Sequence, residues 1–265
     1  MAILADAGRG ADGAFPLLEA AIACAVHEDP ARDAEATRQL AARGVDHLSD
    51  RLKRESPAEA IAEAMAGDLG LSGDLFSEAH PDNADIVAVA GRGRGLAVAI
   101  GIFYLHAARR CGLMVQGVDF PGHFLLRIET EEGPLALDPH AEGRVVLPSE
   151  LTRRALHAGL TPNVADRLEQ LMAPVSDRAV LIRLQNIVFA RASAAGDFDC
   201  AERAALRRAL LDPADHRPWL DVASAREGQG ALAGALEALQ RATALDGGVA
   251  LAARAQRERV RLRLN

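Results

Sequence analysis

Residues 117–140, GVDFPGHFLLRIETEEGPLALDPH, decide the fold class of this chain. HFLLRIE (123–129) and PLALD (134–138) are short β-type runs, and the turn residues EEGP separate them. Two such runs joined by a short Gly-containing turn predict a β-hairpin. Similar runs lie before and after the hairpin, MVQGVDF (114–120) and RVVL (144–147). The stretch therefore predicts a small antiparallel sheet.

The segment before this sheet, LAVAIGIFYLHAARRCGL (96–113), predicts a helix that is apolar nearly all round until its Arg pair. Such a helix is typical of a buried core position, and Gly112 would end it. Residues 14–70 also show helical spacing, and residues 70–85 are rich in Gly, Ser, Asp and Pro, which predicts a loop. From Pro148 onward the pattern is helical without strands. We expect a mostly helical α+β protein with a buried helix packed on the sheet.

Composition excludes several classes of function. The net charge of −7 argues against a nucleic-acid surface, which needs a basic stripe. The longest apolar run, 96–105, is about half of what a bilayer crossing needs. No signal peptide is visible at the N-terminus, and the three cysteines (Cys24, Cys111 and Cys200) have no metal-ligand spacing. We expect a cytoplasmic protein with reduced thiols, no cofactor, no structural metal, no nucleic acid and no membrane.

The C-terminal part repeats with a period of 34 residues, which is the period of the tetratricopeptide repeat. The second copy has Trp219 near its start, whereas the first has Gln185 at that position. The sequence therefore predicts tetratricopeptide-like helical hairpins, and an ordinary array of helical hairpins is the alternative. The corresponding pairs are Gly196 with Gly230, Ala201 with Ala235, Leu211 with Leu245, Asp212 with Asp246, and Pro213 with Gly247.

His123 and Asp138 are the residues that could carry chemistry. Papain-type hydrolases and acyl transferases need a cysteine thiolate at a helix N-terminus, a histidine on an adjacent strand, and an Asp or Asn that orients the imidazole. His123 begins one predicted strand and Asp138 ends the next. A turn at 131–133 would place the two side chains opposite each other, facing the start of the buried helix. A histidine anchored at a turn and an aspartate capping one is the structural alternative.

Three segments together resemble a known family: GRGRGLAVAIGIFYLHAARRCGL (91–113), GVDFPGHFLLRI (117–128) and LALDPHAEGR (135–144). They resemble the bacterial transglutaminase-like branch, which has a papain-type core and appended tetratricopeptide repeats. The resemblance covers nearly the whole chain, and PGHFLLR at its distance before LDP is the most specific part. It implies a transglutaminase-like core in which His123 and Asp138 match the catalytic pair.

The start of the core helix departs from the catalytic members of this family. Catalytic relatives have their nucleophile there, and this branch commonly has Pro with Ser two residues on. This chain has Gly95 and Ala97, and no residue between 91 and 99 has a nucleophilic side chain. Cys111 lies at the other end of the helix, sixteen residues or roughly 24 Å from Gly95. The sequence therefore favours a protein without cysteine catalysis.

Two further sites can be read from the sequence. The GRGRG turn before the helix, with Arg92 and Arg94, is a candidate anion site, and a glycine turn with solvated arginines is the alternative. A ligand bound at this turn would make the protein a small-anion sensor. His123, Asp138 and His140 could instead hold a metal ion.

We expect a non-catalytic transglutaminase-like domain over residues 1–176, with helices at 14–70 and the core at 82–147. Residues 177–265 would form the repeat domain and bind a protein or peptide partner, giving the chain an interaction or regulatory role. The alternative function is a hydrolase or acyl transferase in which His123 and Asp138 activate water or a nucleophile supplied from elsewhere.

Overall fold

The computed structural model describes residues 1–77, 79–245 and 256–261 of the chain. It divides into two compact units. The sheet unit comprises residues 16–180, and the helical unit joins residues 1–15 to residues 181–265. The division at 176/177 expected from the sequence stays a prediction.

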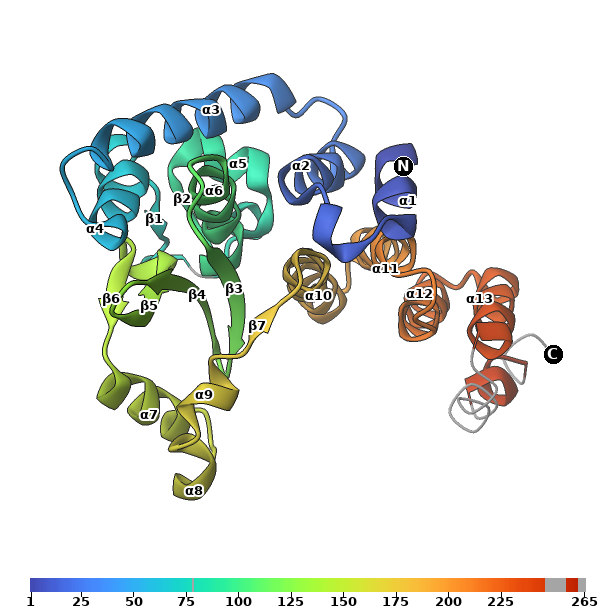
Figure 1. Ribbon diagram of the computed structural model, residues 1–265. Helices are drawn as coiled ribbons and strands as arrows, with labels where there is room; N and C mark the ends of the chain where they lie inside the picture. The colour runs from blue at the N-terminus through green and yellow to red at the C-terminus, as the bar shows by residue number, and fades with distance from the viewer. Residues whose placement is uncertain (78, 246–255, 262–265) are drawn as a thin grey trace. The chain divides into compact units, whose positions relative to one another are not determined.

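Five antiparallel strands form the main sheet of the sheet unit, in the order β6-β5-β4-β3-β7 (Figure 1). The expectation that no strand follows Pro148 is wrong, because β7 pairs with β3 at Gly117 and Val118. A two-residue edge strand is too short to show the alternation by which strands are recognised in a sequence. The strands are β3 (Val115–Phe120), β4 (His123–Thr130), β5 (Gly133–Asp138), β6 (Arg144–Val146) and β7 (Pro174–Val175).

The helix α6 (Ala97–Arg110) packs against one face of this sheet. Ten of its fourteen residues are buried, because α3 (Ala34–Arg51) covers the side that faces away from the strands. The predicted buried helix is therefore confirmed. Figure 1 shows α3, α6 and the sheet as successive layers.

Shorter elements complete this side of the sheet unit. They are α2 (Leu17–Glu28), α4 (Pro57–Ala62) with a π-helical continuation (Glu63–Asp68), α5 (Ile86–Arg92), and the parallel pair β1 (Ser72–Gly73) and β2 (Arg94–Gly95). The helix α4 has Pro57 in its first turn and a capping box between Ser56 and Glu59, and both features favour a helix N-terminus. The expected loop at 70–85 contains β1 and a 3-10 turn, Pro81–Ala84.

Three short helices cover the opposite face of the sheet. They are α7 (Pro148–His157), α8 (Pro162–Ala165) and α9 (Leu168–Leu171), and Figure 1 shows them below the strands. Val118, Phe120 and Leu125 point from the sheet into a cluster with Leu151 and Ala155 of α7. The sheet therefore has an apolar core on both faces. The predicted α+β class, mostly helical with a small antiparallel sheet, is confirmed.

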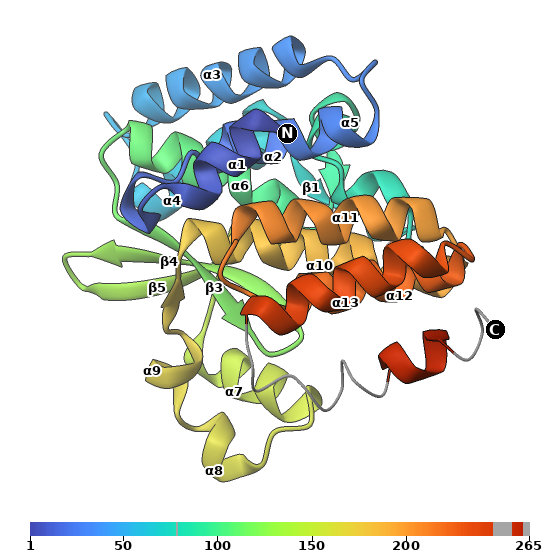
Figure 2. The ribbon, with the colours of Figure 1, turned by 90° about the vertical axis from the view of Figure 1, so that its right-hand side faces the viewer.

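The helical unit contains α1 (Ala2–Arg9), most of α10 (Asp177–Ala195), α11 (Phe198–Leu211), α12 (Arg217–Gly228) and α13 (Leu232–Leu245). In Figure 2 the helices α10 to α13 lie side by side as an array. Both ends of α13 lie 34 residues after the corresponding ends of α11.

Glycines in matching positions make the turns of the two hairpins. Gly196 follows α10 with a φ of 75°, and Gly230 lies between α12 and α13 with a φ of 78°. Only glycine adopts this left-handed conformation without cost, so the two turns are built alike. Ala201 and Ala235 are both fully buried, as expected for positions of close helix packing. The predicted pairs that involve Asp246 and Gly247 lie outside the described residues.

Within the described part of the chain, none of the helices combines the length and the apolar character needed to cross a bilayer.

Candidate functional site

His123 and Asp138 are not directly opposite each other. The hairpin turns over Glu131 and Glu132, so that Thr130 pairs with Gly133 and Leu126 with Leu137. Continuing this register would place Leu125 opposite Asp138, two residues from the expected partner. His123 pairs instead with Phe120 of β3. The sequence correctly predicted the hairpin. Its turn has two residues rather than the expected three, and the strands therefore pair in a different register from the one that would set His123 opposite Asp138.

The two side chains also face away from the buried helix. An ideal Cβ on Gly101 of α6 would lie 2.5 Å from the ring of Phe124, so Phe124 points toward α6. Neighbouring residues of a strand point to opposite faces, which places His123 with Leu125 on the α7 side. Asp138 lies on that side as well, because its carboxylate contacts Arg154 of α7. The expected orientation toward the start of α6 is therefore wrong.

Asp138 is a buried carboxylate with three donors. Nη1 of Arg154 donates to its Oδ2 at 2.7 Å, and the backbone N–H groups of His140 and Ala141 donate to its Oδ1 at 3.0 and 3.4 Å. Its side chain is 7% exposed and that of Arg154 is 15% exposed. Among the described residues, no hydrogen bond joins Asp138 to His123. The carboxylate therefore binds α7 and the 3-10 turn that comes directly after Asp138 (Pro139–Ala141), and it does not bind an imidazole.

The pKa of His123 is lowered from its ordinary value. Partial burial is the main cause, the charge of Arg154 adds to it, and the charge of Asp138 offsets only part of the effect. In a working dyad the carboxylate stabilises the imidazolium, which raises the pKa of the histidine. The shift at His123 has the opposite sign, because burial and the charge of Arg154 outweigh the charge of Asp138.

Glu150 of α7 joins the same network of charges. It accepts hydrogen bonds from Arg144 at 2.7 and 2.9 Å and from Arg154 at 2.8 and 3.2 Å. The hydrogen bonds from Arg144 and then Arg154 are the main causes that lower the pKa of Glu150 to about 2. Arg154 and Glu150 of α7 thus connect Asp138 of β5 to Arg144 of β6 in one chain of ion pairs.

This network predicts a stability that depends on pH. Because the pKa of Glu150 is depressed by folding, its contribution is complete above the ordinary glutamate pKa of about 4.3 and is lost as the pH falls toward 2. The difference in urea midpoint between wild type and Glu150→Gln should be constant above about pH 5 and should shrink below it. A difference that stays the same from neutral to acid pH would contradict this assignment.

The start of α6 is bordered by different residues. Leu96, which precedes the helix, donates its backbone N–H to the carbonyl of Asn83 at 2.9 Å. Gly95 pairs with Gly73 in the short parallel ladder. The imidazole of His140 lies directly on Gly73, since an ideal Cβ there would be 2.3 Å from Cδ2 of the ring. His140, rather than His123, is therefore the histidine beside the strand pair that leads into α6.

Gly73→Ala should destabilise the protein by about 1–3 kcal/mol, because the added methyl group overlaps the His140 ring. Urea unfolding of Gly73→Ala, His140→Ala and the double variant measures the coupling. The double variant should recover most of the stability that Gly73→Ala loses. If the two effects simply add, the close approach of ring and backbone is not the cause.

Arg92 and Arg94, the candidate anion ligands, have different surroundings. Arg92 donates to Oδ1 of Asn83 at 3.0 Å and to Oδ2 of Asp74 at 3.3 Å. The guanidinium of Arg94 lies 5.8 Å from the ring centre of the exposed Phe76. Arg92 is thus engaged within the protein, and an anion at this turn stays a prediction.

Asp74 is the buried acid of this second cluster. Burial raises the pKa of its carboxyl, but hydrogen bonds from Asn83 and from the backbone of Ser77 and Phe76, with the charge of Arg92, outweigh it and lower the pKa. Asn83 is fully buried and donates to the carbonyl of Ser77 at 2.7 Å. Asp74, Asn83 and Arg92 together fix the loop beside the start of α6.

None of the three cysteines belongs to the segment that begins α6. Cys24 is buried in α2 and Cys200 lies in α11 of the helical unit. Cys111 follows the last residue of α6 and donates weakly to the carbonyl of Val45. Burial and then the charge of Asp46 raise the pKa of its thiol, which lowers the fraction of reactive thiolate. Among the described residues, no group of three His, Cys, Asp or Glu side chains is placed to hold a metal ion.

A family comparison covers the whole of this region. The profile described as the transglutaminase-like superfamily matches residues 34–186, more than half of the chain, including α6, the sheet and both candidate residues. The chain belongs to the transglutaminase-like superfamily.

Two curated relatives of this transglutaminase-like protein come from Xylella fastidiosa, and each is named only as a UPF0162 protein. The protein from strain Temecula1 is 29% identical over 235 residues, which cover 87% of this chain and 84% of that protein. The protein from strain 9a5c is 29% identical over 207 residues, covering 76% and 74%. No solved structure matches the chain.

Arg154 is the residue of the transglutaminase-like site that sequence reasoning missed. It lies sixteen residues after Asp138, in a helix whose charged residues are otherwise typical of a solvated face. Asp74 is the second such residue. It lies in a segment whose composition predicts a loop, where a buried acid is not expected. The sequence does carry one signal for Arg154. The spacing Ser-Glu-x-x-x-Arg puts Glu150 and Arg154 on one helix face.

Proposed function

We propose that the transglutaminase-like unit is non-catalytic and that the protein acts as a protein-interaction module through its C-terminal helices. The engagement of Asp138 by Arg154 carries this proposal, because a carboxylate held by an arginine does not orient an imidazole. The segment 91–99 adds support, since it contains no Cys, Ser or Thr. On this proposal, His123 and Asp138 are a remnant of a catalytic pair.

The helical hairpins support the binding role. The 34-residue offset between α11 and α13 and the matching turn glycines are typical of tetratricopeptide repeats. Stacked repeats present an extended concave surface to their partners, and we assign that surface to the first helix of each pair, α10 and α12. We therefore propose a protein or peptide partner on that face.

Enzyme assays test the first part of the proposal. Wild-type protein incubated with a broad peptide panel should show neither amide hydrolysis nor transamidation to an added amine. Any turnover that disappears in His123→Ala would overturn the proposal and favour the hydrolase or acyl transferase reading. Turnover that survives His123→Ala would point to a contaminating enzyme.

Thiol labelling tests the covalent form of that alternative. We expect Cys111 to react with iodoacetamide no faster than a free thiol, because burial raises its pKa. Mass spectrometry after short exposures gives the rate for each cysteine. One cysteine labelled far faster than the other two would contradict the non-catalytic proposal.

A matched pair of surface variants tests the binding face. Ser224 is exposed on α12 and Gln240 is exposed on α13. Ser224→Arg should reduce capture of the partner from the native cell, while Gln240→Arg should leave it unchanged. Equal capture by both variants and by wild type would exclude the α12 face.

A further inference from the structure

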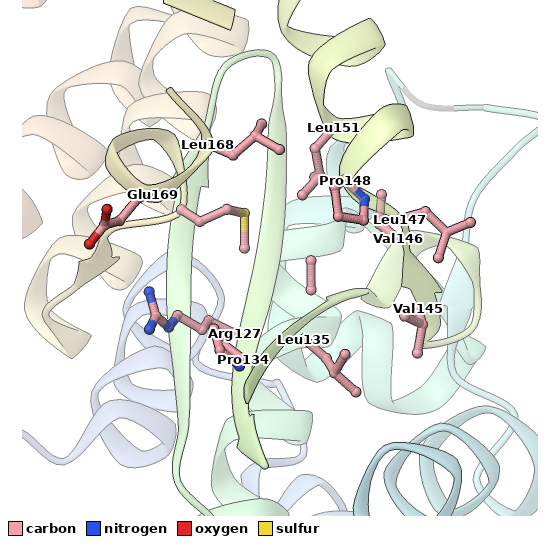
Figure 3. Close-up of a pocket in the computed structure, with 12 residues that line it drawn as sticks. Arg127, Pro134, Leu135, Val145, Val146, Leu147, Pro148, Leu151, Leu168 and Glu169 are labelled. Carbon is pink, nitrogen blue, oxygen red and sulfur yellow. The ribbon is translucent and has the colours of Figure 1, made fainter. Parts of the chain in front are cut away.

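A cavity lies on the α7–α9 side of the sheet, away from α6. Its volume is about 370 Å³, within the range of roughly 300–1,000 Å³ that small-molecule sites occupy. Strands β4, β5 and β6 form one wall, and α7 and α9 form the other (Figure 3). The lining is mostly apolar and includes Leu135, Val146, Leu151, Leu168 and Met172.

Two charged side chains, Arg127 and Glu169, complete the lining of the cavity. Figure 3 shows both on the side of the cavity away from Pro148 and Leu151. Nε of Arg127 donates to Glu129 at 2.6 Å. Within the described residues, the two Nη groups of Arg127 and the carboxylate of Glu169 have no hydrogen-bond partner. The cavity thus has an apolar body and one end with both a donor cation and an acceptor anion.

We propose that this cavity binds a free α-amino acid with a large apolar side chain, such as leucine or phenylalanine. The side chain would fill the apolar body beside Leu151 and Met172. The carboxylate would bind Arg127, which presents its Nη donors as a fork, and the ammonium group would bind Glu169. A fatty acid would place its carboxylate near Glu169, and an apolar amine would place its charge near Arg127. The charge pair therefore favours the zwitterion over either.

The proposal is independent of the binding face on α10 and α12 and of the fate of His123. It adds a small-molecule site to the transglutaminase-like unit, on the face of the sheet that carries α7.

Methionine NMR is suited to this test, because the chain has four methionines and one of them lines the cavity. In full-length protein labelled at the methionine methyl groups, millimolar L-leucine or L-phenylalanine should shift the signal of Met172. The signal of Met65, buried elsewhere in the core, and that of the exposed Met114 should stay in place. A titration in which Met172 does not move at millimolar amino acid overturns the proposal.

Ligand analogues test the two charges separately. 4-Methylpentanoate lacks the amine, 3-methylbutylamine lacks the carboxylate, and L-serine lacks the apolar body. The first two should bind at least about tenfold more weakly than L-leucine, because a lost hydrogen bond to a charged group costs about that much affinity. L-Serine should bind at least about tenfold more weakly as well, because it buries less apolar surface. Equal affinity for any of the three would overturn the assignment of an amino acid.

Variants test the site from the protein side. Arg127→Gln and Glu169→Gln should each weaken L-leucine binding about tenfold or more, for the same reason. Leu168→Trp should block the cavity, and Leu156→Trp, at an exposed position of α7 outside it, is the matched control. Circular dichroism shows whether each variant folds. Unchanged binding in a folded Leu168→Trp protein would also overturn the proposal.

Discussion

Replacing Asp138 by alanine should lower the free energy of unfolding by about 3 kcal/mol, because it leaves the guanidinium of Arg154 in a largely buried site. The variant also loses the acceptor for the backbone N–H groups of His140 and Ala141. Glu150 still binds Arg154 and limits the loss. Urea unfolding monitored by circular dichroism measures the change.

Two comparisons make this result specific to the network. Asp50→Asn removes an exposed carboxylate that pairs with Lys53, and it should change the free energy of unfolding much less than Asp138→Ala does. His123→Ala should also have a small effect, since His123 is exposed and makes no hydrogen bond to Asp138. A loss at Asp138 no larger than that at Asp50 would show that Arg154 does not depend on this carboxylate.

Phe124→Ala should have the largest effect. It should lower the free energy of unfolding by about 3–5 kcal/mol, because it removes the ring that fills the space between β4 and α6. Phe124 is 3% exposed, and its ring occupies the space left by Gly101 of α6 and Gly117 of β3. The loss combines the apolar surface of the ring with the cavity that remains. Thermal and urea unfolding of the purified variant give the value.

A compensating substitution tests the geometry of that contact. Gly101→Leu alone should destabilise the protein, since even its Cβ would lie 2.5 Å from the ring of Phe124. In the Phe124→Ala background the same leucine should restore part of the lost stability by filling the cavity. If the two losses add in the double variant, α6 and β4 are not coupled at this point.

The sequence predicted the sheet and the buried helix because their patterns are strong and local. HFLLRIE and PLALD flank a turn signal, and the run before Arg109 is long and apolar on all sides. The strand β7 and the loop strand β1 could not be predicted, since two residues carry no periodicity. Their formation depends on partners distant in sequence, Gly117 with Val118 for β7 and Arg94 with Gly95 for β1.

The candidate site was predictable by residue type but not by role. The spacing of His123 and Asp138 identified two residues that lie on the same side of the sheet. Whether a carboxylate serves a histidine or an arginine depends on which side chain approaches it in space. Arg154 comes from α7, beyond a turn and a strand. Its spacing from Glu150 predicts a pair within the helix but not the contact with Asp138.

The pairing of α1 with α11 affects how the chain can fold during synthesis. Leu4 and Ala7 of α1 are buried, and an ideal Cβ on Gly8 would overlap the carbonyl oxygen of Leu210 at 1.8 Å. The helix α1 therefore needs a partner that is made some two hundred residues later. All of the sheet unit is synthesised in the interval. Domains generally fold as units in the order of their synthesis. The sheet unit should therefore fold before α11 has been made and before α1 can pack against it.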